Sequence, residues 1–503
     1  MKFPDWQQVD VRWLGVAGSV LVSFYTLLLP EIPNDDAYVY LRTAQLYLDE
    51  GLSAALAHYS WPAYSILIAE FSRLGVPLLT AALLINAAFY ALLVYSFIAI
   101  VQLLDDSRRL ALLATATILL YPELNEFRSM VLRDVGYWAL SLFAIWQLLR
   151  YAREPQFTQA VAFTAAMLLA TAFRLEAVAY LALLPLALLW QARNSAARQH
   201  WTAFYRLSGL VYGLLLAGLM LLALSGSDLL ALAGQVISIY RPFLDSLISP
   251  DPVTTAELGR LLFGEHAAAF SNEYLSVVIM TGLLAILIMT LVYGISGAYF
   301  WLLVYGAWQR YWATDRQGTA VLVAYALINA VILIGFLYLT RFLTSRYAIP
   351  LGLMAATQIP FVVNRILLAI QGKPRETLVR NFLILFFVFC FFDAYVSFGR
   401  SKAYLEDAVD YVNVHATPQQ ALITNNHTIA FTSGRVTAYD EVPRLLPASA
   451  ITDAQPGDYL ALEMITEVRQ LVGRDDLAPL LEFVTAFPTE REQRVAIYRR
   501  VNP

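Results

Sequence analysis

Two adjacent carboxylates, Asp35 and Asp36, follow the first apolar segment of the chain, residues 13–30. Adjacent carboxylates at a membrane surface repel each other and are costly to desolvate, so such a pair is usually retained for chemistry. The residues that follow, 37–56, have apolar spacing typical of a helix. An acidic pair at a helix start, at the lipid headgroup level, suits an enzyme whose substrate is part lipid and part water-soluble. The alternative is that Asp35 only caps this helix.

Composition places the chain among membrane proteins. Of its 503 residues, 59% are hydrophobic and 14% are charged, and the mean hydropathy is +0.59, far above that of a soluble enzyme. A net charge of −4 without any basic run gives no support for a nucleic-acid partner. The single cysteine, Cys390, excludes a disulfide framework and a cysteine metal site. Lys2 and Arg12 precede the first apolar segment, which we expect to be a retained anchor.

The apolar runs predict a mostly α-helical, multi-pass membrane domain of about eleven spans over residues 1–399. Lysine and arginine gather in alternate connections, which would be cytoplasmic, and Asp35 and Asp36 fall on the opposite side. We therefore expect a plasma (inner) membrane protein with a cytoplasmic N-terminus and an extracytoplasmic C-terminal domain. The runs cover residues 13–30, 77–104, 110–122, 135–149, 159–173, 176–192, 207–224, 275–308, 318–340, 347–363 and 381–399.

Two further features refine this topology. Residues 159–192 are apolar-rich and broken only by Arg174 and Glu176; one helix of that length would be about 50 Å long, so we predict a tight hairpin with both charges at the outer surface. From residue 400 the composition changes, and residues 400–503 are predicted to form a small soluble α/β domain on the outer face. Its expected elements are helices over 401–416 and 466–472 and strands over 421–424, 459–462 and 494–498.

The outward connections of this topology collect carboxylates and arginines on one face. Such a shared polar cavity suits attack on a sugar joined to a lipid phosphate: carboxylates could deprotonate an acceptor hydroxyl or amine, and arginines could hold the leaving phosphate. A single arginine near a membrane end is as often a snorkelling anchor, and a structural role at a helix start is the commoner use of His58. No P-loop, dinucleotide-binding glycine pattern, zinc-protease helix or serine-hydrolase elbow occurs in the sequence.

Three short motifs resemble the GT-C glycosyltransferases, integral-membrane enzymes that use polyprenyl-phosphate sugars and include protein O-mannosyltransferases and the lipid A aminoarabinose transferase. The segment from Asp35 to Ala44, followed by Gly51 and by His58-Tyr59-Ser60-Trp61-Pro62, resembles their first outer loop. Arg133-Asp134 resembles the second acidic motif, and the segment from Ser345 to Pro350 resembles their late Arg/Lys-Tyr-x-x-Pro segment. The resemblance covers the membrane part in order and implies a GT-C-like fold with a C-terminal outer domain.

The resemblance also implies an inverting transfer of a monosaccharide from a polyprenyl-phosphate donor to a lipid, polysaccharide or protein acceptor at the outer leaflet. Asp35 would be the general base, Asp36 would orient the acceptor or help to bind a metal, and Asp134 would support the acceptor side or belong to the same cluster. Arg346, with Arg341 or Arg133, would neutralise the donor phosphate. No cofactor is expected, but a divalent cation stays open because Asp36 stands where many members have Glu. The same cavity is expected to include Tyr38, His58, Arg128, Arg174, Glu176 and Arg241.

Other classes of function stay open at this point. A transporter or flippase of a lipid-linked sugar would carry charges near the bilayer midplane and show symmetric halves, whereas here the charges gather at one face. A non-catalytic scaffold leaves the acidic pair unexplained. An O-antigen polymerase or ligase is a nearer alternative, although its key residues are expected in a large later loop.

Overall fold

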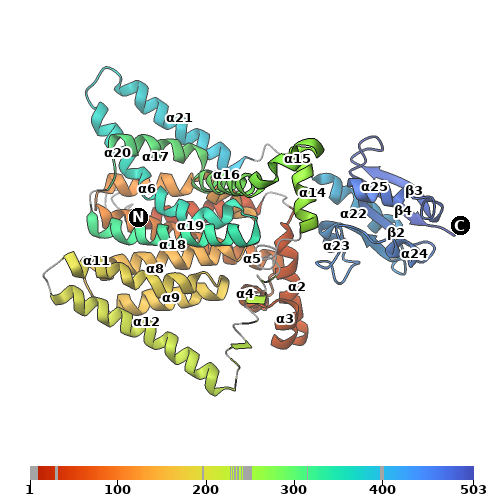
Figure 1. Ribbon diagram of the computed structural model, residues 1–503, viewed down its shortest axis with the longest axis horizontal. Coiled ribbons are helices and arrows are strands. Elements are labelled where there is room, and N and C mark those ends of the chain that lie inside the picture. Colours follow the sequence, from red (N-terminus) through yellow and green to blue (C-terminus); the bar gives the residue numbers. More distant parts are fainter. Residues whose placement is uncertain are drawn as a thin grey trace, which may run out of the picture. The chain divides into compact units, whose positions relative to one another are not determined.

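The computed structural model describes residues 9–28, 32–194, 198–226, 252–313, 315–396 and 402–502, together with single positions between 228 and 241. The chain is predominantly helical and carries one small sheet near its C-terminal end (Figure 1). It divides into two compact units, which interleave along the sequence. The first comprises Met1–Tyr25, Asn86–Arg128 and Arg133–Val396, and the second comprises Thr26–Ile85, Ser129–Leu132 and Ser397–Pro503.

The first unit is a bundle of apolar helices. Neighbouring helices are joined by short connections, such as residues 154–156 between α8 and α9, so that they pack as hairpins. Its main helices are α1 (Val11–Leu27), α5 (Leu78–Leu104), α6 (Arg108–Leu119), α8 (Asp134–Arg153), α9 (Phe157–Phe173), α10 (Ala177–Leu183), α11 (Ala187–Asn194), α12 (Arg198–Leu224), α16 (Leu275–Ile295), α17 (Gly297–Gln309), α18 (Arg316–Thr340), α19 (Ser345–Ala356), α20 (Ile359–Ile370) and α21 (Glu376–Tyr395). Further elements between them are α7 (Pro122–Glu126), η2 (Phe127–Ser129), η3 (Leu184–Leu186), α14 (Pro252–Phe263), α15 (Glu265–Ser271) and η4 (Asn272–Tyr274).

Membrane-spanning length is reached by six helices or helix pairs among the described residues, which makes this an integral membrane protein. The described parts of all eleven predicted apolar runs lie mainly in helices, whereas residues 29–30 and 397–399, at the ends of two runs, lie outside the described residues. The predicted break at Arg174 and Glu176 is confirmed, because α9 ends at Phe173 and α10 begins at Ala177. The six segments of spanning length are Leu78–Leu104, His200–Leu224, Leu275–Ile295, Gly318–Thr340, Ser345–Ile370 and Glu376–Tyr395.

Some predicted runs are interrupted helices. The run 275–308 breaks at Ser296, whose φ is 70° and therefore not helical, and the run 347–363 breaks at Thr357, just before Pro360. Small residues allow α16 and α19 to approach closely, since a side chain at Gly294 would meet Ala348. Close packing of these two helices accompanies contact between the start of α19 and the C-terminal half of α18.

The second unit contains a four-stranded sheet in the order β1-β2-β4-β3, with β1 parallel to β2 and the other pairs antiparallel. The sequence predicted the helix α22, the helix α25 and three of the strands, but not β3, an edge strand with mostly half-exposed or exposed residues. The strands are β1 (Leu422–Thr424), β2 (Tyr459–Glu463), β3 (Leu481–Phe487) and β4 (Val495–Arg500), and the helices and turns are α22 (Ala403–His415), α23 (His427–Ser433), α24 (Ser449–Thr452), α25 (Thr466–Val472) and η5 (Ala478–Leu480).

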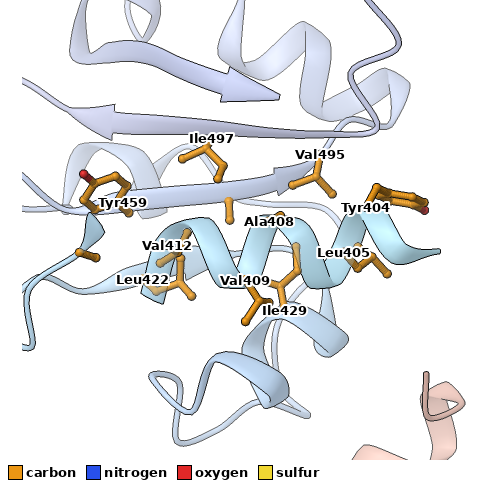
Figure 2. Packing of buried hydrophobic residues seen from close by; sticks show 12 residues of the cluster. Tyr404, Leu405, Ala408, Val409, Val412, Leu422, Ile429, Tyr459, Val495 and Ile497 are labelled. Atoms are coloured by element: carbon orange, nitrogen blue, oxygen red, sulfur yellow. The ribbon is translucent and has the colours of Figure 1, made fainter. Parts of the chain in front are cut away.

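One of the two hydrophobic clusters of this domain lies between α22 and the sheet, as Figure 2 shows. Leu405, Val409 and Val412 recur at the spacing of one helix face and meet Val495 and Ile497 of β4. Burying each such side chain contributes about 1.5–3 kcal/mol. The same unit contains α2 (Asp35–Glu50), α3 (Leu52–His58) and α4 (Ala63–Ser72), which pack on one another. The turn from α2 to α3 uses Gly51 at φ 89°, a conformation that favours glycine.

Candidate active site

The acidic pair occupies the first two positions of α2. The helix begins at Asp35, and its N-cap residue, Asn34, makes no side-chain capping hydrogen bond. Asp35 is exposed and Asp36 is half-buried. Both carboxylates interact favourably with the helix dipole, by about 0.3–1 kcal/mol each, but Asp35 is not a side-chain cap. Asp35 therefore does not cap this helix through its side chain, and its carboxylate is accessible.

Asn34 fixes the start of α2 by a two-point hydrogen bond. Its Nδ2 donates to the carbonyl of Val131 at 3.2 Å, and the Val131 amide donates to its Oδ1 at 2.8 Å. Val131 belongs to the connection between η2 and α8, three residues before Asp134 in the sequence. A side chain that pairs with a backbone in this manner imitates a strand partner and holds both segments in register.

Tyr38 and His58 were predicted to line a cavity, but the structure gives them partners within the protein. Tyr38 is 1% exposed and its hydroxyl donates to Thr428 Oγ1 at 2.9 Å. Burial raises the pKa of Tyr38 to about 12, so it stays a neutral hydroxyl. Nε2 of His58 lies 2.8 Å from Oδ2 of Asp440, within hydrogen-bond distance. Both residues connect α2 and α3 to the C-terminal domain.

A second charged cluster lies in the first unit, where α8 begins and the α9–α10 hairpin turns. Asp134 is 2% exposed and Arg174 is 8% exposed. Nη1 of Arg174 donates to Asp134 Oδ1, and Nη2 donates to Glu176 Oε1 at 2.5 Å. Burial disfavours the Asp134 carboxylate, but the charges of Arg174 and Arg346 outweigh it and hold the pKa of Asp134 below its ordinary value. The guanidinium of Arg174 thus bridges two carboxylates at the end of the bundle.

Close packing of α8 and α9 places Arg174 over Asp134. Gly136 lies two residues after Asp134, and the ring of Phe173 covers it so tightly that an added Cβ would be 2.6 Å from Cε1 of that ring. Phe173 is the last residue of α9, and Arg174 follows in an extended conformation, with φ −146° and ψ 129°. A larger residue at 136 would push the hairpin away from α8.

A small cavity adjoins this cluster and reaches α18 and α19. Its volume is about 20 Å³, enough for one water molecule and too small for a sugar. The guanidinium groups of Arg174 and Arg346 lie 4.5 Å and 5.3 Å from the ring centre of Tyr347, within range of cation–π attraction. The cavity is lined by Asp134, Tyr137, Trp138, Arg174, Glu176, Asn329, Ile332, Leu333, Phe336, Arg346 and Tyr347.

Of the other arginines predicted to belong to the site, Arg133 lies near Asp134, whereas Arg341 and Arg241 do not line the cavity. Arg133 is the N-cap of α8 and its charge also lowers the pKa of Asp134. Arg341 is exposed, has φ 56°, and does not line the cavity. Arg241 is exposed, at an isolated position of the sparsely described segment, and does not line the cavity either.

Arg128 does not line this cavity, and its donors are directed to neighbouring groups of the protein. It is 3% exposed and donates to Asn125 Oδ1 at 2.8 Å, to the Ser19 carbonyl at 3.1 Å and to Ser23 Oγ at 2.7 Å. Its guanidinium also lies 4.1 Å from the ring centre of Tyr90. These contacts join α1 to the turn after α7, and they use the donors that a ligand would need.

Glu123 is a candidate that the sequence interpretation did not select. It lies in α7 between apolar neighbours, and burial, reinforced by Glu126 and Asp393, raises its pKa to about 7 despite a hydrogen bond with Ser345. Ser345 precedes Arg346 at the start of α19. The sequence pattern that could have pointed to Glu123 is Tyr121-Pro122-Glu123. In it, a proline occupies the first position of a helix and follows a buried aromatic residue.

The question of a divalent cation can be judged from the donors. Among the described residues, no group of three or more histidine, cysteine or carboxylate side chains is arranged to hold a metal ion. The Asp134 carboxylate is bonded to the guanidinium of Arg174. A divalent cation held with the help of Asp36 stays a prediction.

Comparison with solved structures identifies the fold. The chain aligns with ArnT from Cupriavidus metallidurans in the apo state, with a TM-score of 0.51 and 13% identity over 98% of each chain. It also aligns with the oligosaccharyltransferase of Archaeoglobus fulgidus in the apo form, with a TM-score of 0.51 and 12% identity over 86% of this chain. Both solved proteins are GT-C glycosyltransferases. This chain has the GT-C fold.

The GT-C fold confirms the fold class expected from the sequence motifs: an apolar helical bundle with a small C-terminal α/β domain. The chain covers 64% of the archaeal enzyme, less than two thirds of its length. The same enzyme tethered to an acceptor peptide that contains the NVT sequon gives a TM-score of 0.50 at 12% identity. No protein-family profile and no curated protein sequence matches the chain.

Proposed function

We propose that this protein is a membrane glycosyltransferase that transfers a monosaccharide from a polyprenyl-phosphate carrier to a lipid, polysaccharide or protein acceptor at the outer leaflet. The observation that carries the proposal is the exposed Asp35 carboxylate at the start of α2 in a chain with the GT-C fold. The sequence motifs that resemble GT-C enzymes begin at this same residue. The buried charges of the helical bundle support it on the donor side.

The proposed reaction is a single displacement with inversion. An acceptor hydroxyl or amine attacks the anomeric carbon while the bond from that carbon to the phosphate oxygen breaks, and polyprenyl phosphate leaves. Asp35 accepts the proton of the acceptor, and Asp36 orients the same group. The acceptor must approach from the side opposite to the leaving phosphate, which requires an accessible base such as Asp35.

The donor phosphate is assigned to Arg346 and Arg133. The charge of Arg174 is already matched, because it bonds both Asp134 and Glu176. The clustered charges of Asp134, Glu176, Arg174 and Arg346 cancel, and Arg133 adds one positive charge, so the end of the bundle can accept a phosphate. Arginine suits this role because its planar fork of donors matches two phosphate oxygens.

The test is Asp35→Asn, compared with Asp49→Asn. Asp49 lies on the same helix and is exposed, so the control makes the same chemical change at a position without a proposed role. Asp35→Asn should insert and fold normally, yet lower turnover about 10²–10⁴-fold, measured as release of polyprenyl phosphate from a panel of polyprenyl-phosphate hexoses and pentoses. Asp36→Asn should also lose activity. Normal transfer by the Asp35 and Asp36 variants would show that the pair has no catalytic role.

The orientation in the membrane is part of the proposal. Cys390 is the single cysteine of the chain and is buried, so in a Cys390→Ser background Thr437→Cys and Lys373→Cys report on opposite sides. Both positions are exposed in the structure. A membrane-impermeant maleimide should label position 437 from outside the cell and position 373 only after permeabilisation. The reverse pattern would place Asp35 in the cytoplasm and exclude an outer-leaflet acceptor.

A further inference from the structure

The helix that carries the acidic pair is attached to the C-terminal domain at its first turn. Tyr38 is 1% exposed, and its hydroxyl is 2.9 Å from Thr428 Oγ1. Its ring stacks on His427, with centroids 5.8 Å apart, and tilts against Phe431 at 5.6 Å. These partners all lie on α23, which follows Tyr38 by about four hundred residues in the sequence. The contact is therefore long-range, buried and both polar and aromatic.

A second attachment lies further along α2. His58, at the end of α3, is hydrogen-bonded through Nδ1 to Thr43 Oγ1 at 2.9 Å and through Nε2 to Asp440 Oδ2 at 2.8 Å. The His58 side chain is 14% exposed and that of Asp440 is 3% exposed. Thr43 is fully buried in α2. His58 thus bridges the middle of α2 to a carboxylate of the C-terminal domain.

Helix α23, which contributes Thr428 to these contacts, is held firmly within the C-terminal domain. The Asn426 side chain caps α23 by accepting from the amides of Thr428 at 2.9 Å and Ile429 at 3.2 Å. Ile429 is fully buried and packs in the core with α22 and β4, as Figure 2 shows. Thr428 is therefore presented from a capped helix that is anchored in the domain core. Movement of this helix would break the cap or open the core.

Position along α2 explains why these contacts matter for the acidic pair. Tyr38 follows Asp35 by three residues, so the two lie on the same side of the helix, one turn apart. Thr43 lies more than one turn beyond Tyr38. Two fixed points at different heights determine both the rotation and the tilt of a helix. Asp35 is itself exposed, so the direction of its carboxylate depends on how firmly the helix below it is held.

We infer that the C-terminal domain positions the Asp35–Asp36 helix, with Tyr38, Thr428, His58 and Asp440 as positioning residues. The inference rests on the proposed function, because it concerns the placement of the proposed base. The residues do not touch the substrate: they act through α2. Loosening either attachment should leave donor binding in the bundle intact and lower the rate of the step in which Asp35 takes up the proton.

The first test is Thr428→Val, which keeps the shape of the side chain and removes the hydroxyl. Thr432→Val is the matched control, since Thr432 is exposed on the same helix α23. Thr428→Val should lower kcat about 10- to 100-fold, as misplacement of a catalytic group by about 1 Å does, with the KM for the polyprenyl-phosphate sugar unchanged. Thr428→Ser should recover most of the loss, because serine restores the hydroxyl partner of Tyr38.

The second test needs no substrate. Hydrogen exchange of the full-length protein in lipid nanodiscs should show faster exchange of the amides of residues 39–44 in Thr428→Val and in Asp440→Asn than in wild type. Asp453→Asn, an exposed carboxylate of the same domain, is the control for the second variant and should not change exchange in that segment. The two attachments are independent, so combining Thr428→Val with Asp440→Asn should accelerate exchange further.

The outcomes separate this inference from the proposed function. If Asp35→Asn abolishes transfer while Thr428→Val and Asp440→Asn behave like their controls in both kcat and exchange, the attachments do not position α2 and the inference is wrong. If exchange rises as expected but neither wild type nor any variant transfers a sugar, the attachment stands as a structural fact and the enzymatic proposal fails. A loss of kcat with equal loss of donor affinity would indicate general unfolding, which also contradicts a positioning role.

Discussion

The buried bridge from Arg174 to Asp134 and Glu176 allows a stability prediction of definite size. Arg174→Gln removes the charge and leaves the 2%-exposed Asp134 without its ion-pair partner. Removal of one partner from a buried ion pair typically costs ~3–5 kcal/mol, because the remaining charge is uncompensated. Arg346 still acts on Asp134, and half-buried Glu176 can take up water. We therefore expect the lower end of that range, about 3 kcal/mol.

The assay compares thermal unfolding of purified variants in lipid nanodiscs. The control is Arg153→Gln, which breaks the Arg153–Asp315 ion pair of 2.5 Å in the same unit, with side chains 36% and 20% exposed; an exposed pair contributes about 0–1 kcal/mol. Arg174→Gln should lower the Tm by several degrees more than this control. Adding Asp134→Asn should recover a large part of the loss, because the orphaned charge is then gone.

Two results would refute this reasoning. If Arg174→Gln unfolds at the same temperature as Arg153→Gln, Asp134 is not held as a buried ion by Arg174. If Asp134→Asn adds a further loss to Arg174→Gln, the carboxylate is stabilised by groups other than the arginine. In either case the cluster could not serve as the fixed frame for the donor phosphate.

Three further predictions follow from the same site. Arg346→Ala should raise the KM for the polyprenyl-phosphate sugar strongly and Arg346→Lys should recover only part of it, since lysine cannot present two parallel donors; an unchanged KM and turnover would make Arg346 a snorkelling anchor. Burial raises the pKa of Glu123 from 4.5 to about 7, so the folded state retains a proton that the unfolded state has lost. Stability should therefore fall as pH rises between those values, and Glu123→Gln should flatten the decline in Tm between pH 5 and pH 8, whereas an equal decline in both proteins would contradict the raised pKa. Incubation with EDTA should leave sugar transfer unchanged, and loss of transfer that Mn²⁺ or Mg²⁺ restores would show that a cation site exists.

The positions of the membrane helices were largely predictable, because apolar runs and positive charges report on the bilayer directly. The hairpin at Arg174 and Glu176 was also predictable, since a single helix there would be too long and its charges would be misplaced. The breaks inside runs were not. Ser296 interrupts an apolar stretch without any proline or charge beside it, so only tertiary packing reveals that α16 and α17 are separate.

The sequence allowed several residues of the candidate site to be selected, but it did not predict which partners their side chains contact. Asp134 and Arg346 were selected because their segments resemble GT-C motifs, and Arg174 because it is a charged residue of an outward connection. The structure brings all three to one cavity. Arg128 met the same criteria, yet its partners are Ser19 and Ser23, two small residues whose pairing with a distant arginine leaves no sequence pattern. The partners of Tyr38 and His58 lie in the C-terminal domain, beyond the reach of any local pattern.

The environments of Asp35 and Asp134 assign them different roles, although both match acidic motifs of the GT-C enzymes. A general base must be reachable by the acceptor and free to take up a proton; Asp35 is exposed and meets the first condition. Asp134 is buried against a guanidinium that holds its pKa below the ordinary value, so it is a poor base. We infer that Asp134 instead fixes Arg174, whose guanidinium lies over the ring of Tyr347 beside Arg346. Under the proposed function, Asp134 would act on the donor phosphate through these contacts, and Asp35 would act on the acceptor.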